Sequence, residues 1–288
     1  MREQLQALLA GMLVIVIGFF GYNTLFHGQE DAQLVVIEAA GSVVRTDGGG
    51  KQEVAIVGMA LHPRDELAVG PGSSAALQIG EETRLSLEAE SAIRVIGIEN
   101  SSVRVELEEG RVSARVRPNS PALSVTSRGR AVFADDADFT MATDLDGVLN
   151  VNAEAGTLSL SGFDQAATLA PGQRLSALPG APAVIAPIPE GLLLDVEWPQ
   201  LVATREEELF LEGRTAPFAA VSVVVHDRSM SLRAGADGRF RAPFQLSEGG
   251  NPVSVVVRDA LGNHQQTSRA FERTSMPPPL NIQVDWGP

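Results

Sequence analysis

The sequence predicts an all-β protein in which a single transmembrane helix precedes two β-sheet domains. A charge-free apolar run near the N-terminus predicts the helix. After that run, short segments of alternating apolar and polar residues predict strands, because successive side chains of a strand point to opposite faces of a sheet. Residues 178–189 contain four prolines, and we expect them to separate the two β domains.

The helix is predicted from a run that begins at Leu5 and ends at Phe26. No Asp, Glu, Lys or Arg lies between Gln4 and Gln29, and about 20 apolar residues suffice to cross a bilayer. A cleaved signal peptide is the alternative, but it would have an apolar core of about 7 to 15 residues and a small-residue cleavage site. We expect residues 1–30 to form a short cytoplasmic start and an uncleaved anchor in the cytoplasmic (inner) membrane, with the bulk of the chain in the periplasm or outside.

Composition excludes several classes of function. The net charge of −14 argues against nucleic-acid binding, which depends on Lys and Arg neutralising phosphates. The chain has no cysteine, which excludes disulfides, thiolate zinc sites and thiol nucleophiles. The four histidines, His27, His62, His226 and His264, lie far apart without the spacing of a metal motif. We therefore expect no cofactor and no metal site.

Residues 31–178 are predicted to form a multi-stranded β domain, either a sandwich or solenoid-like. Leu85, Leu87 and Ala89 alternate with polar residues and should share one buried face. Farther along, the pattern predicts a hairpin with a two-residue turn at Glu109 and Gly110, which would place Leu107 opposite Val112.

The second domain is predicted at residues 197–274, after a proline-rich linker at 179–196. Its short apolar segments, such as residues 220–225 and 253–258, predict a small β-sandwich. Trp198 stands at its start, where packing at the domain boundary is expected. Residues 275–288 are a Pro-rich tail too polar to build a core of its own.

The first domain contains five short phrases in a fixed order, namely AGSV at 40–43, DELAVG at 65–70, GSSAALQI at 72–79, EGRV at 109–112 and LAPGQRL at 169–175. In these phrases it resembles the FecR domain of bacterial membrane-anchored signalling and envelope proteins. One departure is Ala137-Asp138 before Phe139, where the family has Gly-Thr. In signalling members a cytoplasmic domain ahead of the helix binds a sigma factor. Only about five residues precede the helix here, too few to fold, so we expect no direct anti-sigma role.

The second domain resembles bacterial immunoglobulin-like (Ig-like) modules. The phrases are DGRF at 237–240, LSEGGN at 246–251 and DALGN at 259–263, each a turn in which Gly or Asn suits a positive φ. This resemblance implies a spacer or adhesion module.

A cluster of arginines is the candidate partner-binding site. Arg111, Arg115, Arg117, Arg128 and Arg130 follow one another with no acidic residue among them. Three of the five share strand parity and hence one face, which could meet an anionic protein partner or cell-wall carboxylates. The alternative is a solvated face balanced by Glu106, Glu108 and Glu109 on a neighbouring strand.

The sequence carries no signature of catalysis. Asp144 and Asp146 begin a segment that departs from a calcium-binding loop, because Ala155 occupies the position of the final Glu. His226 and Asp227 are adjacent on a strand end and should point to opposite faces, which makes a poor catalytic dyad. We expect a protein that is not an enzyme.

Together these features predict a non-enzymatic interaction or scaffold protein of the bacterial cell envelope. It would bind protein partners, in a larger membrane assembly or in contact with the cell wall, through both domains. The alternative hypothesis is a sensory relay in which the FecR-like domain receives an envelope signal and passes it to another membrane protein. An enzyme with an unrecognised carboxylate site is a third hypothesis.

Overall fold

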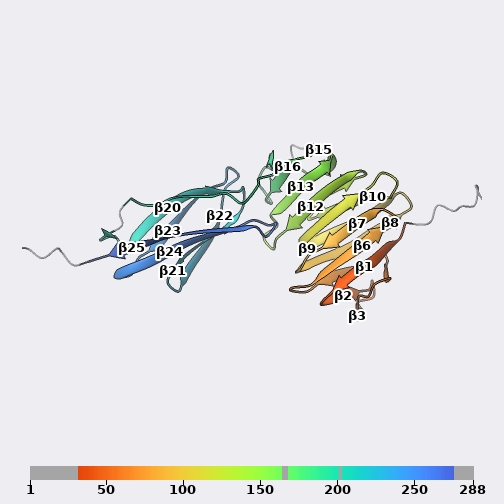
Figure 1. Cartoon of the computed structure of the whole chain (residues 1–288), viewed down its shortest axis with the longest axis horizontal. Helices are drawn as coiled ribbons and strands as arrows, with labels where there is room; N and C mark the ends of the chain where they lie inside the picture. Colours follow the sequence, from red (N-terminus) through yellow and green to blue (C-terminus); the bar gives the residue numbers. More distant parts are fainter. Residues whose placement is uncertain (1–31, 164–167, 201–202, 276–288) are drawn as a thin grey trace, which may run out of the picture.

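The computed structural model describes residues 32–163, 168–200 and 203–275, and all regular elements in these ranges are strands (Figure 1). The all-β prediction is therefore confirmed for the described residues. The helix predicted between Leu5 and Phe26 lies outside them. Within the described ranges, no helix has the length and apolar character needed to cross a bilayer.

Strands β1–β17 form the first module, which consists of two sheets that share β9. One sheet has the order β4 (Ala60–Leu61), β1 (Leu34–Ala40), β6 (Ser74–Ile79), β7 (Thr83–Leu87), β9 (Ser102–Val116), β12 (Ala137–Thr143), β13 (Leu149–Gly156), β16 (Gln173–Ala177), β17 (Val184–Pro187). The other has the order β3 (Gln52–Val54), β2 (Val43–Thr46), β5 (Glu66–Val69), β8 (Ser91–Glu99), β9, β10 (Ala122–Ser127), β11 (Arg130–Ala134), β14 (Leu158–Ser161), β15 (Thr168–Leu169). We call them the first and second sheets. One hydrophobic core, which contains side chains from both sheets, lies between them.

The alternation predicted on β7 is present, because Leu85 and Leu87 are buried while Arg84 is exposed and Ser86 is half-buried. Ala89, which we placed on the same buried face, is exposed because β7 ends at Leu87. The alternation of apolar residues therefore identified the strand correctly, but the predicted strand extended beyond its actual end at Leu87.

The hairpin predicted at Glu109 and Gly110 is wrong, because β9 continues straight through both residues. Leu107 pairs with Ile93 in the second sheet, whereas Val112 pairs with Met141 in the first sheet. The glycine adopts a φ of 87°, and here this conformation carries one long strand from one sheet into the other instead of reversing it. Glycine with positive φ suits a turn and a sheet-switching kink equally, so the local sequence did not separate them.

Strands β18–β25 form the second module, which also has two sheets. The smaller sheet has the order β18 (Leu194–Glu197), β20 (Glu208–Thr215), β23 (Arg239–Gln245), and the larger has β19 (Ala203–Thr204), β25 (His264–Arg273), β24 (Gly249–Arg258), β21 (Ala220–Val225), β22 (Arg228–Arg233). A separate hydrophobic core joins them. Trp198 packs on it with its ring 6.0 Å from that of Phe271, which is the packing role expected for this tryptophan.

The two modules lie end to end along the long axis of the molecule (Figure 1). Part of the segment predicted as a linker is β17, which pairs with β16 as the last strand of the first sheet. Proline is tolerated there because an edge strand has a side that needs no ladder hydrogen bond. The chain between the modules is therefore short, since β17 ends at Pro187 and β18 begins at Leu194.

Replacing Gly110 with alanine should destabilise the first module by about 2 to 4 kcal/mol, because the φ is positive and the space is occupied. A Cβ at this position would lie 2.6 Å from the carbonyl oxygen of Glu90 and would overlap Ser91. Gly50→Ala is the matched control, since Gly50 has a φ of 86° and nothing within 4 Å of the added atom. Urea unfolding of both variants measures the difference; equal losses would contradict a steric requirement at Gly110.

Candidate functional site

The five arginines predicted to bind a partner are engaged within the chain. Arg111 and Arg115 lie on the outward face of β9, because Val112, Ala114 and Val116 are buried on the opposite face, and Arg117 follows the last residue of the strand with the same parity. Arg117 donates to Asp138 at 2.7 Å, and Arg115 lies 3.8 Å from the same carboxylate. The acid that balances this face is thus Asp138 on β12, rather than the glutamates of the alternative hypothesis.

The other two arginines hold turns in place. Arg128 donates to the carbonyl oxygen of Leu145 at 2.9 Å, and Arg130 donates to that of Leu178 at 3.1 Å. The Arg130 guanidinium also lies 5.7 Å from the centroid of the Phe163 ring. Binding of a partner by these arginines stays a prediction, and any partner would have to compete with the contacts described.

Arg111 differs from the rest because it reaches the second module. It pairs with Glu88 and also donates to the backbone oxygen of Leu261 in the turn between β24 and β25. Burial lowers the pKa of the Arg111 side chain and Asp259 opposes this effect, but a guanidinium stays charged at neutral pH. This arginine therefore belongs to the junction between the modules.

At the centre of the junction, Arg174 of the first module meets Asp259 of the second. Their closest nitrogen and oxygen atoms are 3.2 Å apart, and the side chains are 7% and 1% exposed. Arg174 also donates to Asn152 at 2.8 Å, while Asn263 donates to the Asp259 carboxylate from its backbone and side chain. Burial lowers the pKa of Arg174, and the interaction with Asp259 counteracts that change. Both charges are thus compensated inside the structure.

A second ion pair crosses the junction at the segment considered for calcium. Arg233 on β22 donates to Asp144 at 2.8 Å and also bonds Asp146. The two aspartates therefore hold a guanidinium in this structure. Within the described ranges, no group of three or more histidine or acidic side chains is arranged to hold a metal ion.

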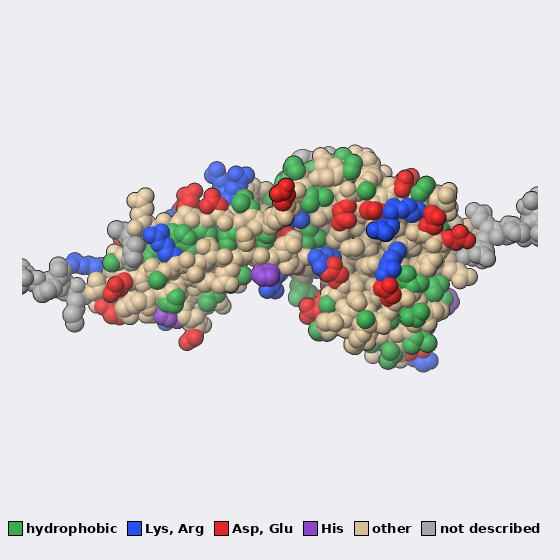
Figure 2. All heavy atoms as spheres, viewed as in Figure 1, with side chains coloured by type: hydrophobic (Ala, Val, Ile, Leu, Met, Phe, Trp, Pro, Cys, Tyr) green, Lys and Arg blue, Asp and Glu red, His purple; other side chains and the backbone are tan. Residues whose placement is uncertain are grey.

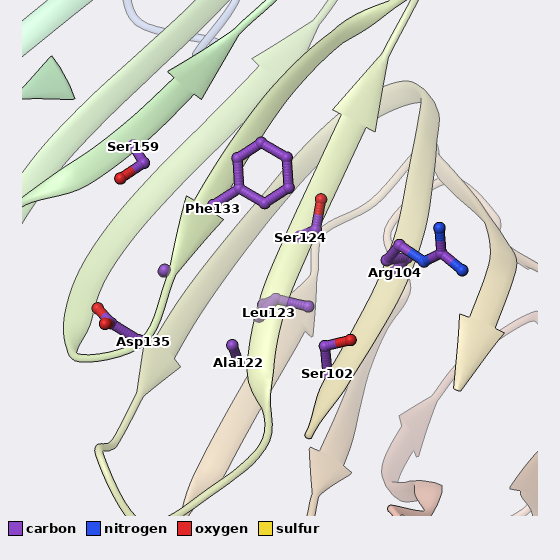
Figure 3. Close-up of a pocket in the computed structure, with 9 residues that line it drawn as sticks. Ser102, Arg104, Ala122, Leu123, Ser124, Phe133, Asp135 and Ser159 are labelled. Atoms are coloured by element: carbon purple, nitrogen blue, oxygen red, sulfur yellow. The ribbon is translucent and has the colours of Figure 1, made fainter. Parts of the chain in front are cut away.

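A hollow on the outer face of the second sheet is the candidate interaction site that the sequence did not indicate. It has a volume of about 340 Å³ and lies across β9, β10, β11 and β14 (Figure 3). Phe133 lies in it with 43% of its surface exposed, and Ser124 and Ser159 lie on either side of the ring. Arg104 and Asp135 lie at opposite ends in this view. An aromatic ring among hydroxyls, with one charge of each sign, offers the mixture found at protein-binding surfaces.

Phe133 was missed because it stands in an unbroken apolar run from Ala131 to Ala134. Such a run does not say which parity faces the core. In the structure Val132 and Ala134 are buried, so Phe133 is outward. An aromatic side chain on the outward parity would have indicated a binding surface, because exposing it to water is unfavourable, but the sequence did not reveal which parity was outward.

Comparison with protein families finds a match within the first module. The model described as "FecR protein" matches residues 65–159. A FecR domain is found there. The match contains the phrases at 65–70, 72–79 and 109–112, whereas those at 40–43 and 169–175 lie outside it. All residues that line the Phe133 hollow belong to the FecR domain, as do the five arginines.

Solved structures and curated proteins add little to this assignment. Two crystal structures of a protein described as a "putative anti-sigma factor" from Parabacteroides distasonis ATCC 8503 align with this chain at 17% identity and a TM-score of 0.38. The alignment covers 42% of this chain and 59% of theirs, so this chain spans less than two thirds of their length. No curated protein matches.

Replacing Arg174 with methionine should lower the free energy of unfolding by about 3 to 5 kcal/mol, because Asp259 would be left buried without its countercharge. The matched control is Arg239→Met, which removes an exposed pair with Asp237 at 3.8 Å and should cost less than about 1 kcal/mol. Calorimetric and urea unfolding of both variants provide the comparison. A loss at Arg174 no larger than at Arg239 would contradict a structural role for the buried pair.

Proposed function

We propose that the protein is a non-enzymatic interaction protein of the bacterial cell envelope, whose FecR domain binds a protein partner at the Phe133 hollow. The observation that carries the proposal is the coincidence of this amphipathic hollow with the FecR match. In the proposal, residues 5–26 anchor the chain in the cytoplasmic membrane and the two modules lie outside it. The charge-free run supports the anchor, because it has the length and composition of a membrane span.

The second module is proposed to be an Ig-like spacer. Its two sheets around one core, and its turn phrases, support this assignment. Gly238 in the DGRF phrase has a φ of 76° in the turn before β23, and Asp259 closes its turn by accepting from the Asn263 backbone at 2.9 Å. Asn251 is fully buried and bonds Ser247 and Gly249, so the LSEGGN phrase fixes the β23–β24 turn.

A sensory relay is the second candidate function, in which the same arm passes an envelope signal to another membrane protein. It is favoured by the FecR match together with the buried pair between Arg174 and Asp259. Because this pair and the Arg233 contacts couple the modules, a partner that moves one module would also move the other. The scaffold function and the relay function would therefore use the same binding surface. They differ in the partner, which is a structural protein for the scaffold and a membrane-embedded regulator for the relay.

Replacing Phe133 with serine should weaken capture of the partner about tenfold or more, since a central exposed aromatic residue is the type that dominates interface energies. The control is Phe210→Ser, because Phe210 is similarly exposed at 46% but lies in the second module, against Arg241. Cross-linking in envelopes followed by purification of the full chain identifies the partner and measures its yield for each variant.

The outcome also separates the candidate functions. A stoichiometric structural assembly supports the scaffold, and a membrane-embedded regulator supports the relay. Unchanged capture by the Phe133 variant would remove the hollow as the binding site. If capture falls only when Arg115 and Arg117 are replaced with serine, the partner binds the face of β9 that carries these arginines, and not the hollow.

A further inference from the structure

The last residue of β3 and the turn that follows it expose three aliphatic side chains. Val54, Ile56 and Val57 are 69%, 62% and 64% exposed, among the most exposed large apolar residues of the described chain. No charged residue occurs from position 54 to position 61. Scattered single apolar residues on a surface are ordinary, but three neighbours on one turn form a patch that calls for a partner.

The patch is held in a fixed shape by the backbone. The Met59 amide donates to the Ile56 carbonyl at 3.1 Å, and Gly58 closes the turn with a φ of 87°. Ala55 points inward, where it is buried, and its amide donates to Val43. The aliphatic tips are thus presented outward by a structured turn.

The same turn is bonded to the first strand that follows the predicted anchor. The Val36 amide donates to Met59 at 2.9 Å, and the Gly58 amide donates to Val36 at 2.8 Å. Between Phe26, where the apolar run ends, and Leu34, where β1 begins, the extended chain spans at most about 30 Å. An anchored chain therefore keeps β1, and the turn beside it, close to the bilayer surface.

The patch lies on the side of the first module that is farther from the second module. Strands β1, β2 and β3 lie along the lower edge of the first module, on the side away from β16 and the second module (Figure 1). Hydrophobic side chains are visible at the lower right of this module in the space-filling view (Figure 2). An anchor joined to the start of β1 would hold this edge nearer to the bilayer than the second module.

We propose that the turn at residues 54–59 is a second membrane contact, which inserts Val54, Ile56 and Val57 into the lipid interface beside the anchor. The inference rests on the proposed anchoring of residues 5–26. Lipid is the favoured occupant because the exposed groups are aliphatic and offer no hydrogen bond for a specific protein contact, whereas apolar groups enter the headgroup and acyl boundary readily. The acidic residue beside the patch does not oppose this occupant, because Glu53 is paired with Arg45 at 2.5 Å and with Lys51 at 3.8 Å.

Two contacts restrain an arm more than one does. A single helix joined to β1 by a short segment leaves the first module free to tilt and rotate. With the turn also held at the interface, the long axis of the molecule would keep one orientation relative to the membrane, and the Phe133 hollow would face a defined direction.

The absence of cysteine allows a clean test with single labels on the full chain. Val57→Cys is labelled with an environment-sensitive nitrobenzoxadiazole dye and reconstituted in vesicles of phosphatidylethanolamine and phosphatidylglycerol. Leu145→Cys is the matched control, since Leu145 is also an exposed aliphatic residue, at 79%, but lies in the turn that contacts Arg233 of the second module. We expect blue-shifted emission and quenching by nitroxide-labelled lipid chains at Val57 only.

Alkaline carbonate extraction separates the contact from the anchor. Protein that resists extraction but carries a water-exposed Val57 label, quenched by iodide as at Leu145, would overturn the membrane contact and leave the anchor intact. Protein that is extracted would overturn the anchor, and a Val57 label that then still responds to lipid quenchers would establish the turn as a contact of its own. A Val57 label already blue-shifted in amphipol without lipid would show that protein covers the turn, and would overturn the proposal.

Discussion

The first module depends on β9, which among the described strands is the one that belongs to both sheets. Its N-terminal half pairs with β8 and β10, and its C-terminal half pairs with β7 and β12. Gly110 makes this crossing feasible, because the backbone of Ser91 and Glu90 approaches so closely that no side chain fits. The crossing brings both sheets onto one core and thereby fixes which face of each sheet is outward. The Phe133 hollow lies on the outer face beside one half of β9, and the arginine face lies on the other half.

The junction between the modules is held by charged side chains, among them Arg111 of the arginine cluster. Arg111 and Arg174 are drawn to Glu88, Leu261 and Asp259, so their charge serves contact between the modules. A buried ion pair gives little net stability, because desolvation offsets attraction, but it makes wrong arrangements costly. Charge at this position therefore favours one relative placement of the modules. The same argument applies to Arg233 with Asp144.

Periodicity predicted the strand class because it reports burial directly, as at Leu85 and Leu87. It could not predict where β9 goes after Gly110, since both a hairpin and a sheet change bury the same alternate residues. The contacts at the junction between the modules could not be predicted from the sequence for a different reason. Arg174 and Asp259 are 85 positions apart, and each looks like an ordinary exposed charge until the modules are placed together. The outward position of Phe133 was hidden for a third reason, namely that an apolar run gives both parities equal weight.

Stiffness at the junction and the proposed membrane restraint of the first module would have a joint consequence. A second module held by the buried pair does not swing about the segment between β17 and β18, and in the proposed membrane arrangement a first module held at two points would not swing about its anchor. An interaction surface on such an arm loses less rotational freedom when a partner binds than a surface on a loose tether does, so more of the contact energy remains as affinity. The modest hollow at Phe133 would then suffice for a specific complex, because orientation is supplied by the architecture and not by the area of the interface.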